Sequence, residues 1–314
     1  LGYYTAYLYQ ALPCYLLGTY YGNGPNYPDD GGATLNESAF LPSGNLYSKA
    51  ISYFDSAMIY ADEYQKKIIH SLLGRQYLYE GNYSAAAQHA LLGLQQSDES
   101  FNALSGEEDP WPNWYWYEAG SNRTRYTLAS RFKHFLGEDF EDTNGNGVWD
   151  STETFTDCAI TGADVGQGNG MYDGPLELEE IVRLSLSVAA MTPGQSYSRY
   201  FQMKYPFADS PVSIIDWKEN HLILAELALR GESVNVTAID AVNSVRSSHG
   251  LQSLASVDYE VLLHERDKEL FCQGQRLIDQ NRFSDILNWH LPDGDTWRYL
   301  PVPFEEALNN PNYP

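Results

Sequence analysis

The 314-residue sequence has few basic residues and no long apolar run. Nineteen Lys and Arg stand against 42 Asp and Glu, a net charge of −23 with a pI near 4.5. A surface this acidic repels phosphate backbones and anionic lipid headgroups, so we expect no nucleic-acid partner. A membrane-spanning helix needs about 18 or more consecutive apolar residues, and no apolar stretch of the sequence is that long. Nothing in it resembles a signal peptide.

Cysteine is also scarce. Cys14, Cys158 and Cys272 are widely spaced and form no CxxC pair, which argues against a metal cage or a redox motif and allows at most one disulfide. The apolar surroundings of Cys14 and Cys272 favour free, buried thiols. The chain opens at Leu1 with residues typical of a helix interior, so we expect an upstream part to precede it.

Apolar and aromatic residues are plentiful. Hydrophobic residues make up 43% of the chain and aromatic residues 14%, with 25 Tyr and 7 Trp. This is enough to build a core, which excludes global disorder. So many tyrosines suggest that the protein presents flat amphipathic rings to a ligand or to neighbouring helices.

Helical periodicity dominates both ends of the chain. Apolar residues recur at the spacing of an amphipathic helix in residues 1–21, 47–64, 68–79, 84–94, 126–136, 176–191, 213–230, 235–249 and 257–274. Leu73-Gly74-x-x-Tyr77, followed by Gly81, Tyr83, Ala86 and Ala90, follows the tetratricopeptide pattern of a helix–turn–helix unit. The small residues allow two helices to pack closely.

These patterns predict a mostly all-α fold with a core of tetratricopeptide-like helix pairs and long irregular loops. We expect a single domain over residues 1–314. Its parts are tetratricopeptide-like helices in 1–96, a loop-rich insertion in 97–175, and C-terminal helices with a closing loop in 176–314.

An aromatic run stands out in the insertion. It contains five large rings: Trp111, Trp114, Tyr115, Trp116 and Tyr117. Pro110 and Pro112 flank the first of them. Such a run cannot be buried entirely as a regular helix, so we expect an exposed loop. Its rings could stack on sugars, or they could pack on a partner or within the core; the sequence leaves both open.

Residues 142–153 match the EF-hand calcium-loop pattern D-x-[DN]-x-[DN]-G-x5-E at every fixed position. Calcium prefers six to eight hard oxygen ligands, and the predicted ligands are Asp142, Asn144, Asn146, Val148 through its carbonyl, Asp150 and Glu153. The segment has few apolar residues, so we expect a structural calcium ion. A degenerate second copy lies at 164–173.

No catalytic constellation is visible. The sequence contains no G-x-S-x-G, H-E-x-x-H, Walker or dinucleotide-binding motif, and its seven histidines are scattered without metal-ligand spacing. Acidic pairs such as Glu107/Glu108 are typical of solvated surfaces. We therefore predict that the protein is not an enzyme.

The C-terminal third carries the most specific motifs. It contains Glu265-Arg266-x-x-Glu269-Leu270, then Gly274-x-Arg276-x-x-Asp279-x-x-Arg282, and closes with Leu300-Pro301-Val302-Pro303-x-Glu305. In this order the motifs resemble the SusD/RagB family of outer-membrane nutrient-binding lipoproteins. The charged residues are suited to ion pairs that tie the last helix to its loop, so we do not count them as a ligand site.

The resemblance implies a protein at the surface of the outer membrane that captures oligosaccharides for a TonB-dependent transporter. The membrane contact would be an N-terminal lipid anchor, and the lipid-attachment cysteine is not present in this sequence. The aromatic run is then the best glycan site. The alternatives are a peptide-binding member of the family and a calcium-stabilised surface scaffold with no small ligand.

Overall fold

A computed structural model describes residues 2–25, 40–106, 111–119, 140–145, 149–155, 186–189, 199–283, 299–302, 304 and 308. The helices in these ranges are α1 (Tyr3–Tyr20), α2 (Ser43–Met58), α3 (Glu63–Glu80), α4 (Tyr83–Leu91), α5 (Trp114–Ala119), α7 (Trp217–Leu229), α8 (Ala238–Ser248), α9 (Tyr259–Glu269) and α10 (Arg276–Arg282). The strands are β1 (Asn23–Pro25), β2 (Phe40–Pro42), β3 (Phe101–Ala103), β4 (Leu186–Ala189), β5 (Arg199–Gln202) and β6 (Val212–Ile215).

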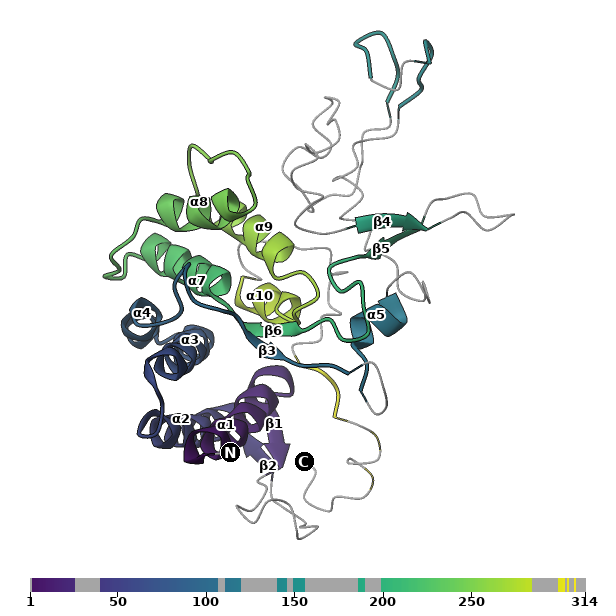
Figure 1. Cartoon of the computed structure of the whole chain (residues 1–314). Helices are drawn as coiled ribbons and strands as arrows, with labels where there is room; N and C mark the ends of the chain where they lie inside the picture. The colour runs from purple at the N-terminus through teal and green to yellow at the C-terminus, as the bar shows by residue number, and fades with distance from the viewer. Residues whose placement is uncertain are drawn as a thin grey trace.

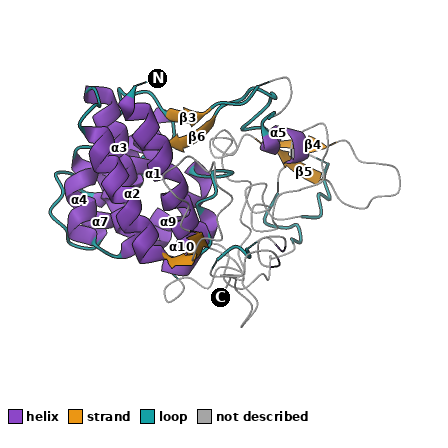
Figure 2. Cartoon of the chain, turned by 90° about the horizontal axis from the view of Figure 1, so that it is seen from below, coloured by secondary structure: helices purple, strands orange, loops and turns teal. Residues whose placement is uncertain are grey.

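The long helices lie together in one helical layer. In Figure 1 they follow one another from α1 and α2 at one end through α3, α4 and α7 to α8 and α9 at the other. Figure 2 shows the same layer from below, with α5, β4 and β5 on the opposite side of the molecule and β3 and β6 between the two parts. The prediction of a mostly helical fold is confirmed.

Local sequence signals set the α3–α4 hairpin. Asp62 and Gln65 form a capping box at the start of α3, and Gly81 ends it in the left-handed conformation at φ 78°, where glycine meets no Cβ penalty. A Cβ atom on Gly74 would stand only 3.2 Å from the backbone nitrogen of Ala90. The small residues of the tetratricopeptide-like pattern therefore permit the close approach that the sequence predicted.

The main core joins helices from both ends of the chain. Its fully buried members include Leu8 and Tyr15 of α1, Phe54 of α2, Leu72 of α3 and Leu222 of α7. Removing such side chains from water is the main favourable contribution to folding. The same α3 and α7 helices are also joined by polar contacts.

One of these is a buried ion pair. The Arg75 guanidinium lies 3.0 Å from the Glu219 carboxylate and also donates to the Ile214 carbonyl oxygen at 2.8 Å. Nearby, the side-chain amide of Asn220 donates to the carbonyl oxygens of Ala90 and Leu94. Buried charged and polar groups need such partners, so these contacts fix how α7 sits against the α3–α4 hairpin.

In the ranges that the structure describes, three antiparallel strand pairs accompany the helices: β1 with β2, β3 with β6, and β4 with β5. Two helix predictions are wrong for part of their range here. Residues 213–215 belong to β6 because they pair with β3, which lies more than a hundred residues earlier, and α7 begins only after the N-cap Asp216. Within the predicted helix 176–191, residues 186–189 form β4. The other residues of this range, and the whole predicted helix 126–136, lie outside the described residues.

The C-terminal prediction also needs correction. The expected helix 257–274 is shorter, because α9 ends at Glu269 and a turn containing Cys272 at φ 58° follows. Cys14 and Cys272 are half-buried rather than buried. In the part of the chain that the structure describes, every helix is too short or too polar to span a bilayer.

Candidate functional site

The aromatic run is partly helical because Asn113 caps α5. Its side-chain oxygen accepts hydrogen bonds from the backbone N–H groups of Tyr115 at 2.9 Å and Trp116 at 3.1 Å. An Asn at this position satisfies N–H groups that have no acceptor within the helix. The prediction of a loop is therefore wrong for Trp114–Ala119.

Asn113 also anchors α5 to a distant segment. Its backbone N–H donates to the Ala208 carbonyl oxygen and its side-chain amide to the Ser210 carbonyl oxygen, each at 2.7 Å. The side chain is buried, with only 1% exposed. These bonds hold the turn that contains the exposed Phe207 beside the aromatic run.

Two of the predicted rings face solvent, Trp111 at 76% exposed and Trp114 at 66%. Phe207, which lies outside the predicted run, is also 66% exposed. The ring of Tyr117 lies 5.6 Å from that of Trp114 and 6.4 Å from that of Trp116, with tilts of 36° and 43°. We call the following residues the aromatic platform: Trp111, Trp114, Trp116, Tyr117 and Phe207.

Tyr115 takes a different position from its neighbours. Its ring stacks on Tyr205 with centroids 5.4 Å apart, and its carbonyl oxygen accepts a hydrogen bond from the Gln202 side chain at 3.1 Å. Burial raises the pKa of both tyrosine hydroxyls. Tyr115 therefore packs α5 against the segment after β5.

The sequence pattern does not point to Phe207 as a site residue. It lies far along the chain from Trp111, in Pro206-Phe207-Ala208-Asp209, where no spacing links it to the aromatic run. The only signal was a large aromatic residue within a short turn-like segment. Recognising it required the contact between Asn113 and Ala208.

The predicted calcium loop is described in part. Asp142, Asn144, Asp150 and Glu153 lie within the described residues, whereas Asn146, Val148 and the second copy at 164–173 lie outside them. The Glu153 carboxylate accepts from the Thr143 N–H at 2.8 Å and from the Asp150 N–H at 2.9 Å. These bonds lower the pKa of Glu153, the bond from Asp150 contributing most.

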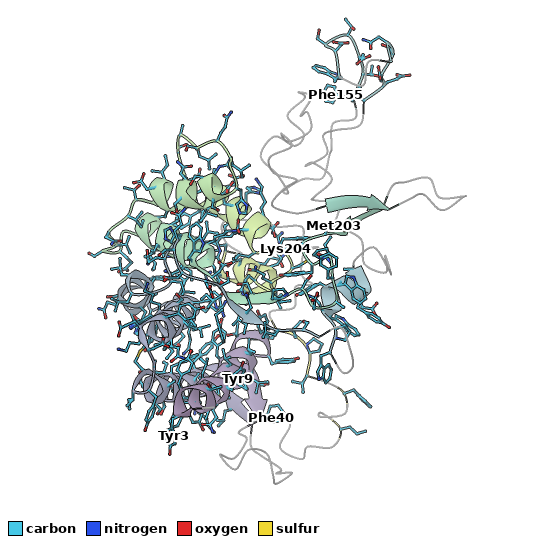
Figure 3. The ribbon with its side chains drawn as sticks, viewed as in Figure 1. Tyr3, Tyr9, Phe40, Phe155, Met203 and Lys204 are labelled. Atoms are coloured by element: carbon cyan, nitrogen blue, oxygen red, sulfur yellow. The ribbon has the colours of Figure 1, made fainter. Side chains whose placement is uncertain are left out.

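The donor chemistry of this loop fits calcium. Three carboxylates and one carboxamide oxygen lie on a short segment whose ends meet at the Phe140–Phe155 bridge, and hard cations bind such oxygens. Across the described ranges, no three His, Cys, Asp or Glu side chains gather closely enough to hold a metal ion. Figure 3 shows Phe155, which marks this loop, well away from the helical layer.

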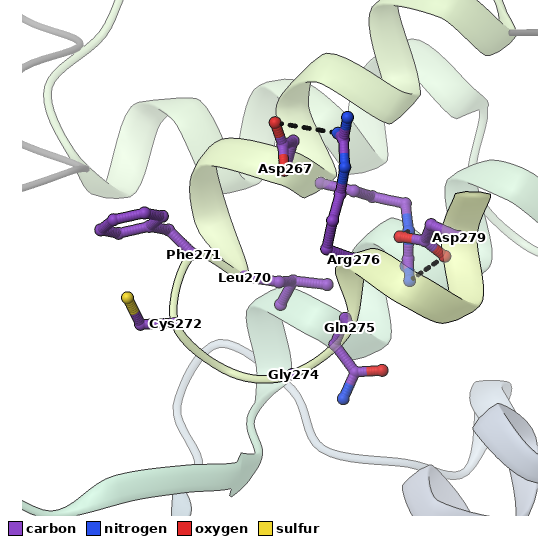
Figure 4. A pocket seen from close by; sticks show the side chains of 9 residues that line it. Asp267, Leu270, Phe271, Cys272, Gly274, Gln275, Arg276 and Asp279 are labelled. Carbon is purple, nitrogen blue, oxygen red and sulfur yellow. Dashed lines mark hydrogen bonds and ion pairs between the residues drawn. The ribbon is translucent and has the colours of Figure 1, made fainter. Parts of the chain in front are cut away.

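The motif that carried the family resemblance forms a buried corner between α9 and α10. Arg266, only 1% exposed, contacts the Asp279 carboxylate at 2.8 Å, and Arg276 contacts Asp267 at 3.1 Å. Figure 4 shows these residues around a cavity of about 50 Å³, large enough for a few water molecules. As predicted, they serve as structural ion pairs.

A larger cavity of about 450 Å³ lies among α1, α2, α3 and α10. Its polar lining groups are largely engaged with protein partners: the Tyr47 hydroxyl bonds that of Thr19, and Arg282 contacts Asp279. The aromatic platform lines neither this cavity nor the smaller one.

Two histidines that are far apart in the sequence, His70 and His89, are in contact. The Nδ1 atoms of His70 on α3 and His89 on α4 are 2.9 Å apart. Burial lowers the pKa of both rings, and that of His89 falls to about 4. Their separation of 19 residues fits no local metal-ligand spacing, so only the packing of the hairpin brings them together.

The fold and the platform together define a class: a helical protein of tetratricopeptide-like hairpins that carries an exposed aromatic surface on a connecting segment. Neither a protein-family model nor any curated protein matches the sequence. Comparison with solved structures is more informative.

Three solved structures illustrate the likeness. A laminarin-binding SusD-like protein has a TM-score of 0.59 at 17% identity, covering 98% of this chain and 76% of its own. Surface glycan-binding protein A from Bacteroides uniformis gives 0.55 at 19%, covering 98% and 76%. B. fragilis NanU gives 0.61 at 14%, covering 99% and 76%. The chain has the SusD-like fold, and the resemblance that its motifs indicated is confirmed at the level of the fold.

Proposed function

We propose that this protein binds oligosaccharides on the aromatic platform without cleaving them. The observation that carries the proposal is the exposure of Trp111 and Trp114, which are 76% and 66% accessible at the surface. Flat rings present an apolar face to the C–H groups of a sugar ring, and burying each such face contributes about 1 kcal/mol. Two proteins of the same fold, named for laminarin and surface-glycan binding, support this choice of ligand.

We propose further that the bound glycan is passed to a TonB-dependent transporter at the surface of the outer membrane. The SusD-like fold supports this role. There are two alternative functions: binding of a peptide ligand, and a scaffold role with no small ligand. A binding experiment discriminates among the three functions.

The test is a calorimetric titration of the protein with a panel of soluble polysaccharides that includes laminarin. Replacing both Trp111 and Trp114 with Ala should remove about 2 kcal/mol of binding free energy, roughly a thirtyfold loss in affinity. Tyr9→Ala is the matched control, because Tyr9 is an exposed ring, at 59%, on α1 in the helical layer.

Undiminished glycan affinity in the double variant would place the glycan elsewhere on the protein. Absence of binding to every polysaccharide in the panel would overturn the glycan function. Titration with mixed peptides would then separate the peptide-binding alternative from the scaffold.

We also propose a structural calcium ion in the 142–153 loop. The match to the calcium-loop pattern and the oxygen donors of Asp142, Asn144, Asp150 and Glu153 support it. These side chains would hold the ion, whose charge would offset the repulsion among their carboxylates.

A further inference from the structure

The charges around the aromatic platform are unevenly distributed. The described segments that form it, 111–119 and 203–211, contain a single basic residue, Lys204. The Lys204 ammonium donates to the carbonyl oxygens of Glu269 at 2.8 Å and Phe271 at 3.0 Å. The positive charge of Lys204 is therefore directed at backbone carbonyl oxygens at the end of α9.

Acidic residues occupy the same two segments. Asp209 is exposed, two residues after the platform ring Phe207, whereas Glu118 on α5 is buried. The accessible charge that these segments contribute is therefore negative.

Sugars that carry carboxylate or sulfate groups need the opposite arrangement. Proteins recognise such anions with Arg or Lys N–H groups, whose charge strengthens the hydrogen bonds. The net charge of −23 adds a repulsive field, which is screened over about 8 Å at physiological salt. Stacking on an aromatic ring requires no such charge, so an uncharged sugar avoids this penalty.

We propose that the aromatic platform selects uncharged oligosaccharides and rejects those that bear carboxylates or sulfates. This selectivity rests on the proposed function, since it concerns the same surface. Asp209 is its specificity-determining residue within the described segments, because it is exposed in the same turn as Phe207, which hydrogen bonds between Phe207 and Ser210 close.

The first experiment compares ligands that share a backbone. Laminarin and pullulan are each titrated in native form and after oxidation of their primary hydroxyls to carboxylates, at 20 mM and at 500 mM NaCl. We expect the oxidised form to bind at least tenfold more weakly at low salt, with the difference shrinking at high salt because the repulsion is screened. Affinity for the native polymer should change little.

The second experiment alters the charge itself. Asp209→Lys should raise the affinity for the oxidised polymer relative to the native one by about tenfold. Asp55→Lys is the matched control, because it makes the same change in net charge at an exposed position on α2. It should leave the ratio of the two affinities as it is in the unmodified protein.

Failure of this inference is distinguishable from failure of the proposed function. Equal or tighter binding of the oxidised polymers would overturn the selectivity while leaving glycan binding in place. An Asp209→Lys ratio equal to that of Asp55→Lys would overturn the role of Asp209. If none of the four polymers binds and the wider panel also fails, the glycan function itself falls, and the selectivity with it.

Discussion

Asn113 illustrates how one side chain can determine the shape of a binding surface. It caps α5 through its oxygen and reaches the 207–210 turn through its nitrogen. Both functions of the carboxamide are used, and the side chain is buried. Neither Asp nor Leu could replace it, because Asp lacks the donor and Leu lacks both groups.

A second effect at the residue scale concerns the pair His70 and His89. The pKa of His89 is lowered from 6.5 to about 4, mainly by burial and further by His70. The unfolded chain therefore takes up a proton first as the pH falls. This pair contributes its full stability above about pH 7 and loses it between about pH 6.5 and 4.

We expect the loss to be about 1 kcal/mol, since both rings are partly solvated and their interaction is screened. Urea unfolding of the protein and of His89→Gln at pH 7.5 and 5.0 measures it. The variant should lose less stability on acidification, whereas a Gln88→Ala control, at an exposed position of α4 beside His89, should behave like the parent protein. An equal loss in all three proteins would contradict the assignment.

At the scale of elements, the calcium loop provides a local test. Trp149 lies within the loop, with its ring edge-on to Phe155 at 5.9 Å, so it can sensitise terbium bound in place of calcium. We expect terbium luminescence that calcium displaces and EDTA abolishes. Glu153→Gln should weaken binding at least tenfold, because the last position of such loops supplies both oxygens of a carboxylate.

Glu141→Gln is the control for this loop. Glu141 lies next to the motif, outside its ligand positions, and accepts a hydrogen bond from Thr154 at 3.0 Å. It should bind terbium as the unmodified protein does. Luminescence that survives in Glu153→Gln, or that never develops in the parent protein, would argue against a calcium site.

Elements also show what the sequence could predict. The long helices could be predicted because the signals that form them lie along their own sequence. Helix α3, for example, begins at the Asp62–Gln65 capping box and ends at Gly81. Strand β6 was assigned to a helix because the partner that makes it a strand, β3, is remote in sequence. The short helix α5 depends on the Asn113 cap. The prolines and aromatic residues around Asn113 favoured a loop, so the cap was not predicted.

The same reasoning applies to the candidate site. The exposure of Trp111 and Trp114 could be predicted from the sequence, because a run of large rings that begins between two prolines cannot be buried entirely. Phe207 and the separate packing role of Tyr115 could not, because both follow from contacts with segments far along the chain. The calcium ligands rest on a local motif and stay a prediction.

At the scale of the molecule, a buried ion network joins three helices. Arg282 on α10 contacts both Glu226 on α7 and Asp279, and Asp279 contacts Arg266 on α9. Leaving one member of such a network without its partner leaves an uncompensated buried charge. The network therefore holds α7, α9 and α10 in one arrangement.

We expect Arg266→Ala to lower the free energy of unfolding by about 3–5 kcal/mol. The double change Arg266→Met with Asp279→Leu should lower it by less, because no charge is then left alone. Urea denaturation measures both, and Lys66→Ala is the control, since its pair with Glu63 is largely exposed and contributes at most about 1 kcal/mol. A similar loss for Arg266→Ala and Lys66→Ala would contradict the network's importance.

The pairing of β3 with β6 has an evolutionary consequence. Strands β3 and β6 pair with each other, and the described segments that carry the platform, 111–119 and 203–211, lie between them in the sequence. The entropy of closing the stretch between two paired strands grows only slowly with its length. The intervening stretch can therefore lengthen, shorten or exchange its rings over generations while every helix of the layer keeps its partners. Under the proposed function, a change of glycan ligand would then require changes in this one interval of the gene, while the sequence of the helical layer stays the same.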